Sequence, residues 1–145
     1  MSRSTALVIS VGAALGALAR EVLGVLANGV SAQVMPWGTL GANLAGAFLL
    51  GLMATHFDAR FRHALFRPFW EIGFIRSFTT MSTFSLQSIR MLEMGAWEVL
   101  LPYVLLSVLG GLIAVWFGEV LGRDLSRRRG TVIDSSRRDE VEREL

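Results

Sequence analysis

Two uncharged, mostly apolar runs of twenty residues limit what this chain can fold into. They are Gly38–Phe57 and Val99–Gly118. A helix rises about 1.5 Å per residue, so each run is long enough to cross the roughly 30 Å hydrocarbon core of a bilayer. Because a segment in lipid must satisfy its own backbone hydrogen bonds, the runs predict membrane-spanning helices.

The N-terminal segment Thr5–Ala27 is also apolar, and it is interrupted by Arg20 and Glu21. We interpret it as a first membrane helix. A signal peptide is the alternative, because Arg3, the apolar stretch and the Ala-Leu-Ala at 17–19 imitate the three regions of such a leader.

The remaining segment, about Ile72–Leu92, has only thirteen uncharged residues between Arg76 and Arg90. This is short for an ordinary span, although arginines near both ends can extend to the membrane surface. An interruption around Arg76–Thr80 would make it similar to the broken helices that build ion sites in transporters. The fold class predicted is therefore an all-α membrane protein of four transmembrane helices with a broken third helix.

The third segment is unusually polar for a membrane helix. Seven hydroxyl residues lie within twelve positions: Ser77, Thr79, Thr80, Ser82, Thr83, Ser85 and Ser88. In hydrocarbon, such groups are tolerated where they face protein or a water-filled cavity. We therefore expect this stretch to line a path or a bound ion.

The composition argues against several other classes of protein. The chain has no cysteine, and its two histidines lack neighbours that would suggest a metal site. It has no Gly-rich Lys-Ser/Thr loop and no plausible Ser-His-Asp set, so we expect no enzyme. The fourteen basic residues flank apolar spans and do not alternate with aromatic residues, which favours contact with membrane lipid and predicts no nucleic-acid partner.

The composition changes after residue 122. Residues 1–122 form the predicted four-helix transmembrane domain. Residues 123–145 are rich in Arg, Asp, Glu and Ser, so they predict a charged and largely disordered cytoplasmic tail. A weak Arg/Glu helix near its end is the alternative.

The charges predict an orientation. Four spans put the N-terminus, the Asp58–Glu71 connector and the tail on one side, and the connecting loops Asn28–Trp37 and Met94–Glu98 on the other, where there is no Arg or Lys. The first side carries Arg3, Arg60, Arg62, Arg67, Arg123, Arg127, Arg128 and Arg129. By the positive-inside rule, both termini are cytoplasmic in a multi-pass protein of the bacterial inner membrane.

Two motifs resemble a known family. The run Thr79-Thr80-Met81-Ser82-Thr83-Phe84-Ser85, together with Gly41-Ala42-Asn43-Leu44-Ala45-Gly46, closely resembles the Fluc/CrcB fluoride channels, and the resemblance covers roughly Gly12–Gly122. It implies passive export of fluoride through an antiparallel dimer. The fixed orientation favours a separate homologous partner, and a homodimer is the alternative.

The resemblance also implies which residues line the fluoride path. In the family an Asn of the second helix and two Phe of the third do so; Asn43 and Phe84 match, but Met81 replaces the first Phe. A thioether has no positive ring edge, so we expect a weaker or absent site at Met81. The alternatives are a helix–helix hydrogen bond for Asn43 and simple packing for Phe84.

Three more residues are expected along this path, namely Thr80, Tyr103 and Ser107. Tyr103 and Ser107 lie one helical turn apart and match polar positions of the family. Tyr103 could instead be an interfacial aromatic residue, and Ser107 could bond its own backbone one turn back. Arg20 matches a family arginine near the end of the first helix, and we expect it to neutralise Glu21 or to attract anions to the vestibule.

A structural sodium ion is a further implication of the resemblance. Its ligands would be the backbone carbonyl groups of Arg76 and Thr79. The family usually has Gly at the position of Arg76, so its guanidinium could repel the cation or replace its charge. An arginine that reaches the lipid headgroups is the alternative.

Two other functions stay open on the sequence alone. A small multidrug transporter also has four spans, but it needs a carboxylate in mid-membrane, whereas Glu21 follows Arg20 and Glu119 lies at the last boundary. A non-conducting partner subunit of a heterodimeric channel is the other alternative, and Met81 and Arg76 favour it.

Overall fold

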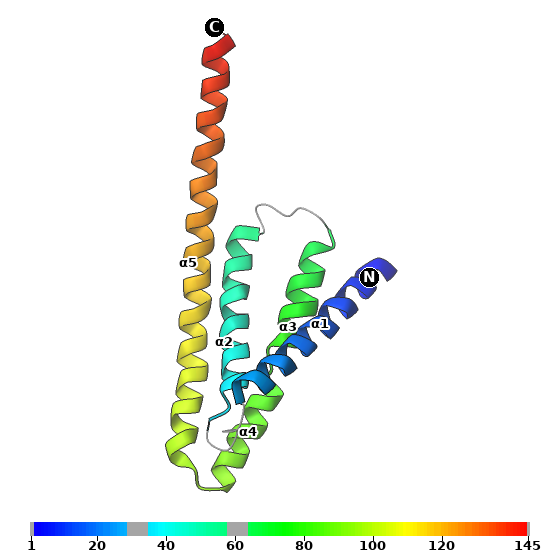
Figure 1. Ribbon diagram of the computed structural model, residues 1–145, viewed down its shortest axis with the longest axis vertical. Helices are drawn as coiled ribbons and strands as arrows, with labels where there is room; N and C mark the ends of the chain where they lie inside the picture. Colours follow the sequence, from blue (N-terminus) through cyan, green and yellow to red (C-terminus); the bar gives the residue numbers. More distant parts are fainter. Residues whose placement is uncertain (1, 29–34, 58–63, 145) are drawn as a thin grey trace.

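The computed structural model describes residues 2–28, 35–57 and 64–144, with side chains described for 2–27, 35–55 and 64–127. Within these ranges the chain is helical, without a strand, as predicted (Figure 1). The elements are α1 (Arg3–Asn28), α2 (Trp37–Leu52), η1 (Met53–Phe57), η2 (Pro68–Ile75), α3 (Arg76–Phe78), α4 (Met81–Glu93) and α5 (Trp97–Glu144), where η marks a π-helix. The predicted loop at 29–34 and the connector residues 58–63 lie outside the described ranges.

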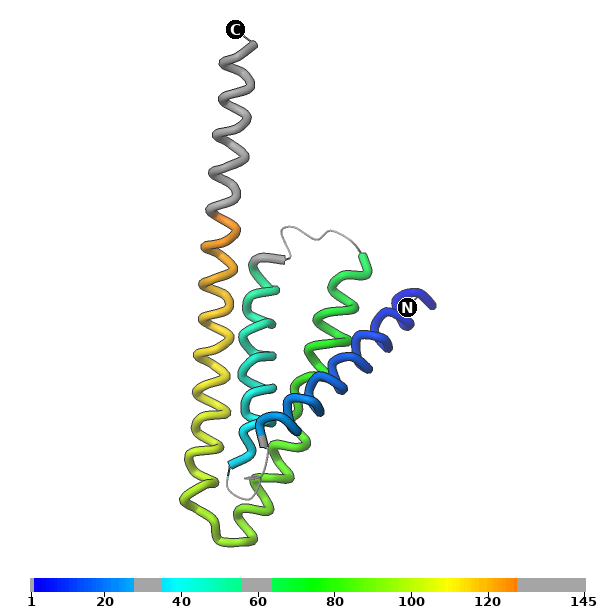
Figure 2. Tube along the Cα trace, viewed as in Figure 1, coloured from blue at the N-terminus to red at the C-terminus, as the bar shows by residue number. Residues whose placement is uncertain are grey.

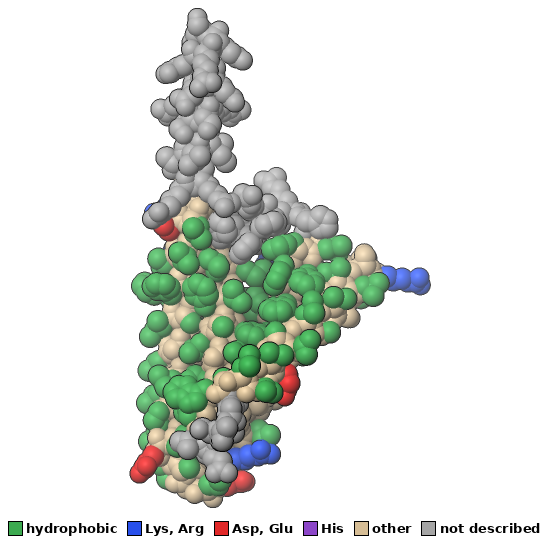
Figure 3. Space-filling model, viewed as in Figure 1, with side chains coloured by type: hydrophobic (Ala, Val, Ile, Leu, Met, Phe, Trp, Pro, Cys, Tyr) green, Lys and Arg blue, Asp and Glu red, His purple; other side chains and the backbone are tan. Residues whose placement is uncertain are grey.

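Three helices are long and apolar enough to cross a membrane, and they match the first, second and fourth predicted spans. They are Arg3–Ala27, Trp37–Thr55 and Trp97–Arg127. Large apolar side chains remain exposed along the first and last of them, for example Leu26 and Ile113. Figure 3 shows this apolar coat on one face of the bundle. Such a surface suits lipid as the surrounding solvent.

The third segment consists of η2, α3 and α4. Between Phe78 and Met81 two residues are extended, Thr79 at φ −81°, ψ 156° and Thr80 at φ −148°, ψ 118°. The charged connector is shorter than the predicted Asp58–Glu71, because η2 already begins at Pro68. Proline suits a first helical turn, since the N–H that it lacks would have no partner there.

The last helix is longer than its apolar run. The sequence predicts a fourth helix over Val99–Gly118 and a largely disordered tail from Asp124, whereas the backbone of α5 is helical to Glu144. Arg and Glu are good helix formers, and a helix that already exists continues without a new nucleation step. Hydropathy therefore predicts where a span ends, but not where its helix ends.

Two helix pairs make up most of the bundle, α2 with α5 and α1 with η2. Figure 2 shows α1 crossing the third segment while α2 runs beside α5. Close backbone approach requires glycine at both contacts. A Cβ at Gly16 would overlap the carbonyl oxygen of Phe74, and one at Gly118 would overlap that of Phe48. Small residues at such positions let helices pack where lipid removes the hydrophobic drive between them.

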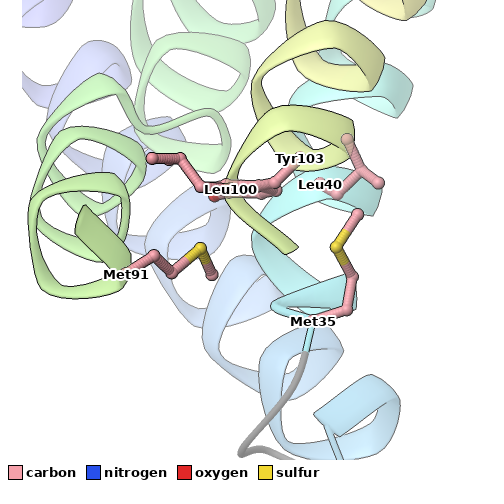
Figure 4. Packing of buried hydrophobic residues seen from close by; sticks show 5 residues of the cluster. All are labelled: Met35, Leu40, Met91, Leu100 and Tyr103. Carbon is pink, nitrogen blue, oxygen red and sulfur yellow. The ribbon is translucent and has the colours of Figure 1, made fainter. Parts of the chain in front are cut away.

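A small apolar cluster lies where α2 begins, α4 ends and α5 begins. Its buried members are Met35, Leu40, Met91, Leu100 and Tyr103 (Figure 4). Phe84 of α4 is half-buried and packs against this cluster. The cluster thereby holds α4 against α2 and α5.

Candidate functional site: the break between two helices

The backbone of Thr80 is held by one side chain from another helix. Asn43 of α2 accepts a hydrogen bond from the N–H of Thr80 through Oδ1 at 2.8 Å, and its Nδ2 donates to the carbonyl of Thr80 at 3.1 Å. The polarity of the peptide group fixes the orientation of the amide. One N–H of Asn43 stays outside this pair of bonds, because Nδ2 carries two.

Two helical hydrogen bonds are replaced at the break. In a continuous helix the N–H of Thr80 would bond the carbonyl of Arg76, and the N–H of Thr83 would bond that of Thr79. Here the N–H of Thr80 bonds Asn43, and the N–H of Thr83 bonds Oγ1 of Thr80 at 3.1 Å. The carbonyl groups of Arg76 and Thr79 are therefore released from the helical pattern.

Opposite partial charges meet at this point. The last carbonyl groups of α3 carry the negative end of one helix, and the first N–H groups of α4 carry the positive end of the next. Thr80 is the N-cap of α4, and its hydroxyl also bonds that of Thr83 at 3.0 Å. Such a junction offers oxygen ligands to a cation and N–H donors to an anion.

Two pockets share Thr80 as a lining residue. The Arg76 pocket, about 430 Å³, is lined among others by Asn43, Glu71, Arg76, Thr79, Met81 and Ser107. The Arg20 pocket, about 300 Å³, is lined among others by Arg20, Glu21, Thr39, Thr83 and Gln87. Polar side chains thus reach Thr80 from two sides of an otherwise apolar bundle.

Phe84 and Tyr103 come together on the apolar side of the break. Their ring centroids are 5.2 Å apart with the planes tilted by 46°. Tyr103 is fully buried, so its side chain does not face lipid, and its hydroxyl donates to Oε1 of Gln87 at 2.8 Å. Phe84 therefore packs against the cluster that contains Tyr103, which is the arrangement that the packing alternative for Phe84 expects.

The other sequence candidates lie on the opposite side. Met81 is 72% exposed and lines the Arg76 pocket, as does Ser107. The Oγ of Ser107 is buried and has no hydrogen-bond partner among the described residues, so the bond to its own backbone is not made. The structure thus brings Asn43, Thr80, Met81 and Ser107 to one pocket and places Phe84 and Tyr103 elsewhere.

Among the described residues, two arginines near the break, Arg20 and Arg76, lack the ion pairs that a charged side chain in an apolar bundle usually needs. Arg20 makes no ion pair with Glu21, and its Nε is buried without a partner in the described part of the chain. Arg76 is exposed, and its side chain forms no hydrogen bond or ion pair with any described residue. Within the described residues neither arginine has an ion-pair partner, and each lines one of the two pockets.

Sequence reasoning missed two polar side chains at this site. Gln87 follows Thr83 by four residues on α4 and bonds Tyr103, and Glu71 lines the Arg76 pocket from η2. The four-residue spacing of polar residues on an apolar helix was a usable signal for Gln87. Glu71 had none, because the π-helical turn that carries it looked like part of the connector.

A cation at the break would rely on backbone oxygen. The described residues contain no group of three or more His, Cys, Asp or Glu that could hold a metal ion. The carbonyl groups of Arg76 and Thr79 are oxygen ligands of the kind that hard cations prefer. They lack their usual helical donors, so these two groups fit the sodium ion that the sequence resemblance implies.

The chain matches known proteins over most of its length. Residues 7–119 match the family described as "CrcB-like protein, Camphor Resistance (CrcB)". A protein of Magnetococcus marinus named "Fluoride-specific ion channel FluC" is 38% identical over 117 residues, which cover 79% of this chain and 94% of that protein. Proteins of the same name from Leptospira interrogans and Agrobacterium fabrum are 41% and 35% identical, over 73% and 81% of this chain and 84% and 94% of their own lengths.

Proposed function

The chain belongs to the CrcB-like family, and we propose on this premise that it is a subunit of a fluoride-specific ion channel. The channel lets fluoride leave the cytoplasm passively and so limits its toxicity. The observation that carries the proposal is the break at Thr79–Thr80, where two polar pockets reach one backbone position inside a lipid-compatible bundle. No catalytic step is required, and the family is one of channels and not of enzymes.

The chemistry of the break suits a small, strongly hydrated anion. Fluoride that sheds water needs replacement donors, and each site must stay weak enough to release the ion. The unused N–H of Asn43 and the first N–H groups of α4 are such donors, and the hydroxyl of Thr80, which donates to Thr83, lies beside them. The hydroxyl of Ser107 adds a donor in the Arg76 pocket. Phe84 and Tyr103 lie elsewhere at the break, where the ring edge of Phe84 offers a weakly positive contact and the hydroxyl of Tyr103 holds Gln87, a lining residue of the Arg20 pocket.

The third segment would cross the membrane as a broken span. Its extended residues leave backbone groups without helical partners, which lipid does not tolerate but a polar path does. Asn43 satisfies Thr80 in this way. Residues 1–122 would then form the channel domain of four spans, and 123–145 a charged cytoplasmic tail.

A sodium ion at the break would complete its electrostatics. The carbonyl oxygens of Arg76 and Thr79 would hold it, and its charge would compensate the negative end of α3. The arginine side chain at 76 carries a positive charge of its own, but backbone ligands do not depend on side-chain identity. Asn43 and Thr80, which is the N-cap of α4, would orient these carbonyl groups whether or not the ion is bound.

The assembly would be an antiparallel dimer in the inner membrane with both termini cytoplasmic. The arginine bias favours one orientation for this chain, so an oppositely oriented homologous subunit is the preferred partner over a second copy. The exposed apolar faces of α1 and α5 leave room for lipid and for that partner.

Met81 supports a second candidate within the same family. It is an exposed thioether where the family has an aromatic ring, so this chain would act as the less conductive or non-conducting subunit of a heterodimer. The family match decides against the small multidrug transporter, which belongs to a different class.

The test is reconstitution. We would purify the chain alone and with a homologous subunit, insert each preparation into liposomes, and record fluoride and chloride efflux with ion-selective electrodes. The proposal expects fluoride efflux without chloride efflux from at least one preparation. Correctly assembled protein that passes no fluoride in either, or that takes up cations in exchange for protons, would overturn it.

A further inference from the structure

One face of the last helix carries an exposed stripe that changes from apolar to basic along its length. Its six members follow one another every three or four residues of α5: Leu109, Leu112, Trp116, Val120, Arg123 and Arg127. Side chains at this spacing lie on one face of a helix. The four apolar members are between 45% and 62% exposed, and both arginines are exposed as well. We call this face the α5 stripe.

The α5 stripe faces away from the rest of the described bundle. The helix α2 packs on the other side of α5, where a Cβ at Gly118 would overlap the carbonyl oxygen of Phe48 and one at Gly122 would overlap Oγ1 of Thr55. Gly118 follows Trp116 by two residues, which at about 100° per residue places it across the helix from the stripe. The residues of the stripe line neither of the two pockets at the break.

The order of residue types along the stripe is that of a phospholipid from its tail to its headgroup. Leu109 and Val120 are about 16 Å apart along the helix axis, close to the roughly 15 Å of hydrocarbon in one leaflet. Trp116 has an apolar ring with one polar N–H, which suits the boundary between tails and headgroups. Arg123 and Arg127 follow within two turns of Val120, and their long side chains can reach a lipid phosphate.

The basic end of the stripe keeps a positive charge after its local ion pair is counted. Arg123 bonds Glu119 one turn away. From Glu119 to Arg129 the helix has four arginines and two acids, so 4 − 2 leaves a net charge of +2. Because α5 stays helical through this segment and extends beyond the other helices, the charges have a set height above the last apolar turn (Figure 1). A basic cluster directly after a membrane span attracts anionic lipid.

We propose that the α5 stripe binds an anionic phospholipid, with an acyl chain along Leu109, Leu112 and Val120 and the phosphate at Arg123 and Arg127. Charge complementarity selects an anionic lipid over a zwitterionic one, whose second charge the arginines would repel. The stripe lies apart from the break, so the inference goes beyond the proposed channel function and its test does not depend on conduction.

Trp116 itself can report the lipid that lies against the stripe. In a chain that carries Trp37→Phe, Trp70→Phe and Trp97→Phe, Trp116 is the remaining tryptophan. We would reconstitute this chain in phosphatidylcholine vesicles that contain increasing fractions of brominated phosphatidylglycerol or brominated phosphatidylcholine. Bromine quenches indole fluorescence on contact, so the two curves give a relative binding constant. We expect phosphatidylglycerol to be preferred about three- to tenfold at about 10 mM ionic strength, and less at about 300 mM.

The arginines should determine that preference. Arg127→Gln should reduce it by at least half, Arg123→Gln together with Arg127→Gln should bring it close to one, and Arg127→Lys should keep it. Arg3→Gln is the matched control, because Arg3 is an exposed arginine that the topology puts on the same side of the membrane but on α1. Symmetric vesicles contain the same lipids in both leaflets, so a variant that inserts in the opposite direction still gives a valid result.

Each other outcome would overturn the lipid site. Equal quenching by the two lipids, or a preference that the changes at Arg123 and Arg127 leave intact, shows that the charges do not select lipid. Loss of the preference in sodium phosphate but not in sodium chloride of equal ionic strength shows a site for free phosphate. Quenching by neither lipid shows that protein covers the stripe. Thermal unfolding in detergent checks each variant, and Arg127→Gln alone decides if the double variant fails to fold.

Discussion

The amide of Asn43 bonds both backbone groups of Thr80, although the two residues are 37 positions apart in the chain. This contact ends one helix and allows the next to begin at Met81. Oδ1 of Asn43 replaces the acceptor that the N–H of Thr80 would find in the carbonyl of Arg76 in a continuous helix, and Nδ2 adds a donor to the carbonyl of Thr80. The break therefore depends on a contact with α2 as well as on the local backbone conformation of Thr79 and Thr80.

Asn43→Asp should abolish or strongly reduce fluoride flux. Aspartate keeps an acceptor for the N–H of Thr80, but it loses the donor to the carbonyl and places an anion beside an anion's path. Losing that hydrogen bond should also lower stability, by about 0.5–1.5 kcal/mol. Efflux from liposomes and thermal unfolding in detergent measure the two effects separately. Unchanged flux from a correctly assembled protein would return Asn43 to a purely structural role.

Gly46→Ala should disturb the break without touching a polar group. A Cβ at Gly46 would overlap Cγ2 of Thr79, so Thr79 must move or the helices must separate. Overpacking of this kind costs about 1–3 kcal/mol, and we expect a lower unfolding temperature together with reduced fluoride efflux. Gly41→Ala is the control, because its Cβ position meets only Cδ2 of Leu23 at 3.8 Å, an ordinary van der Waals contact, and it lines neither pocket. If both variants behave alike, the fit of Thr79 against α2 does not govern the break.

Met81→Phe should add conductance to an assembly that contains this chain. The exposed side chain at 81 lines the Arg76 pocket, and a ring there would provide the positive edge that the thioether lacks. Phe84→Ile should lower flux only slightly in a mixed assembly, although losing the ring contact with Tyr103 should cost stability by about 0.5–1.5 kcal/mol. Elimination of fluoride efflux by Phe84→Ile alone would show instead that Met81 is an acceptable pore residue.

Nearly all molecules should have a cytoplasmic C-terminus. The arginines of the N-terminus, the connector and the tail lie on one side of the predicted topology, and the opposite loops have none. A C-terminal fusion to paired reporters, one active in the cytoplasm and one in the periplasm, measures the orientation. Comparable signals from the two reporters would show insertion in both directions and remove the argument for an obligate partner.

The apolar runs and the hydroxyl-rich stretch determined the class of protein without any structure. Membrane spans depend on local composition over about twenty residues, so Gly38–Phe57 and Val99–Gly118 could be identified from hydropathy alone. The same stretch marked Thr79 and Thr80 as candidate site residues, because polarity in a membrane segment needs a reason. Local composition did not predict that η2 begins at Pro68 or that α5 continues to Glu144.

Only the tertiary structure decided which polar groups act together. It pairs Asn43 with Thr80, buries Tyr103 against Phe84, and puts Arg76 and Ser107 on one cavity. Each of these relationships joins residues from different helices, and it depends on how close the helices pack and how each is rotated. Those quantities come from the fit of glycines such as Gly16 and Gly118 against neighbouring backbones, and a linear pattern of residue types does not contain them.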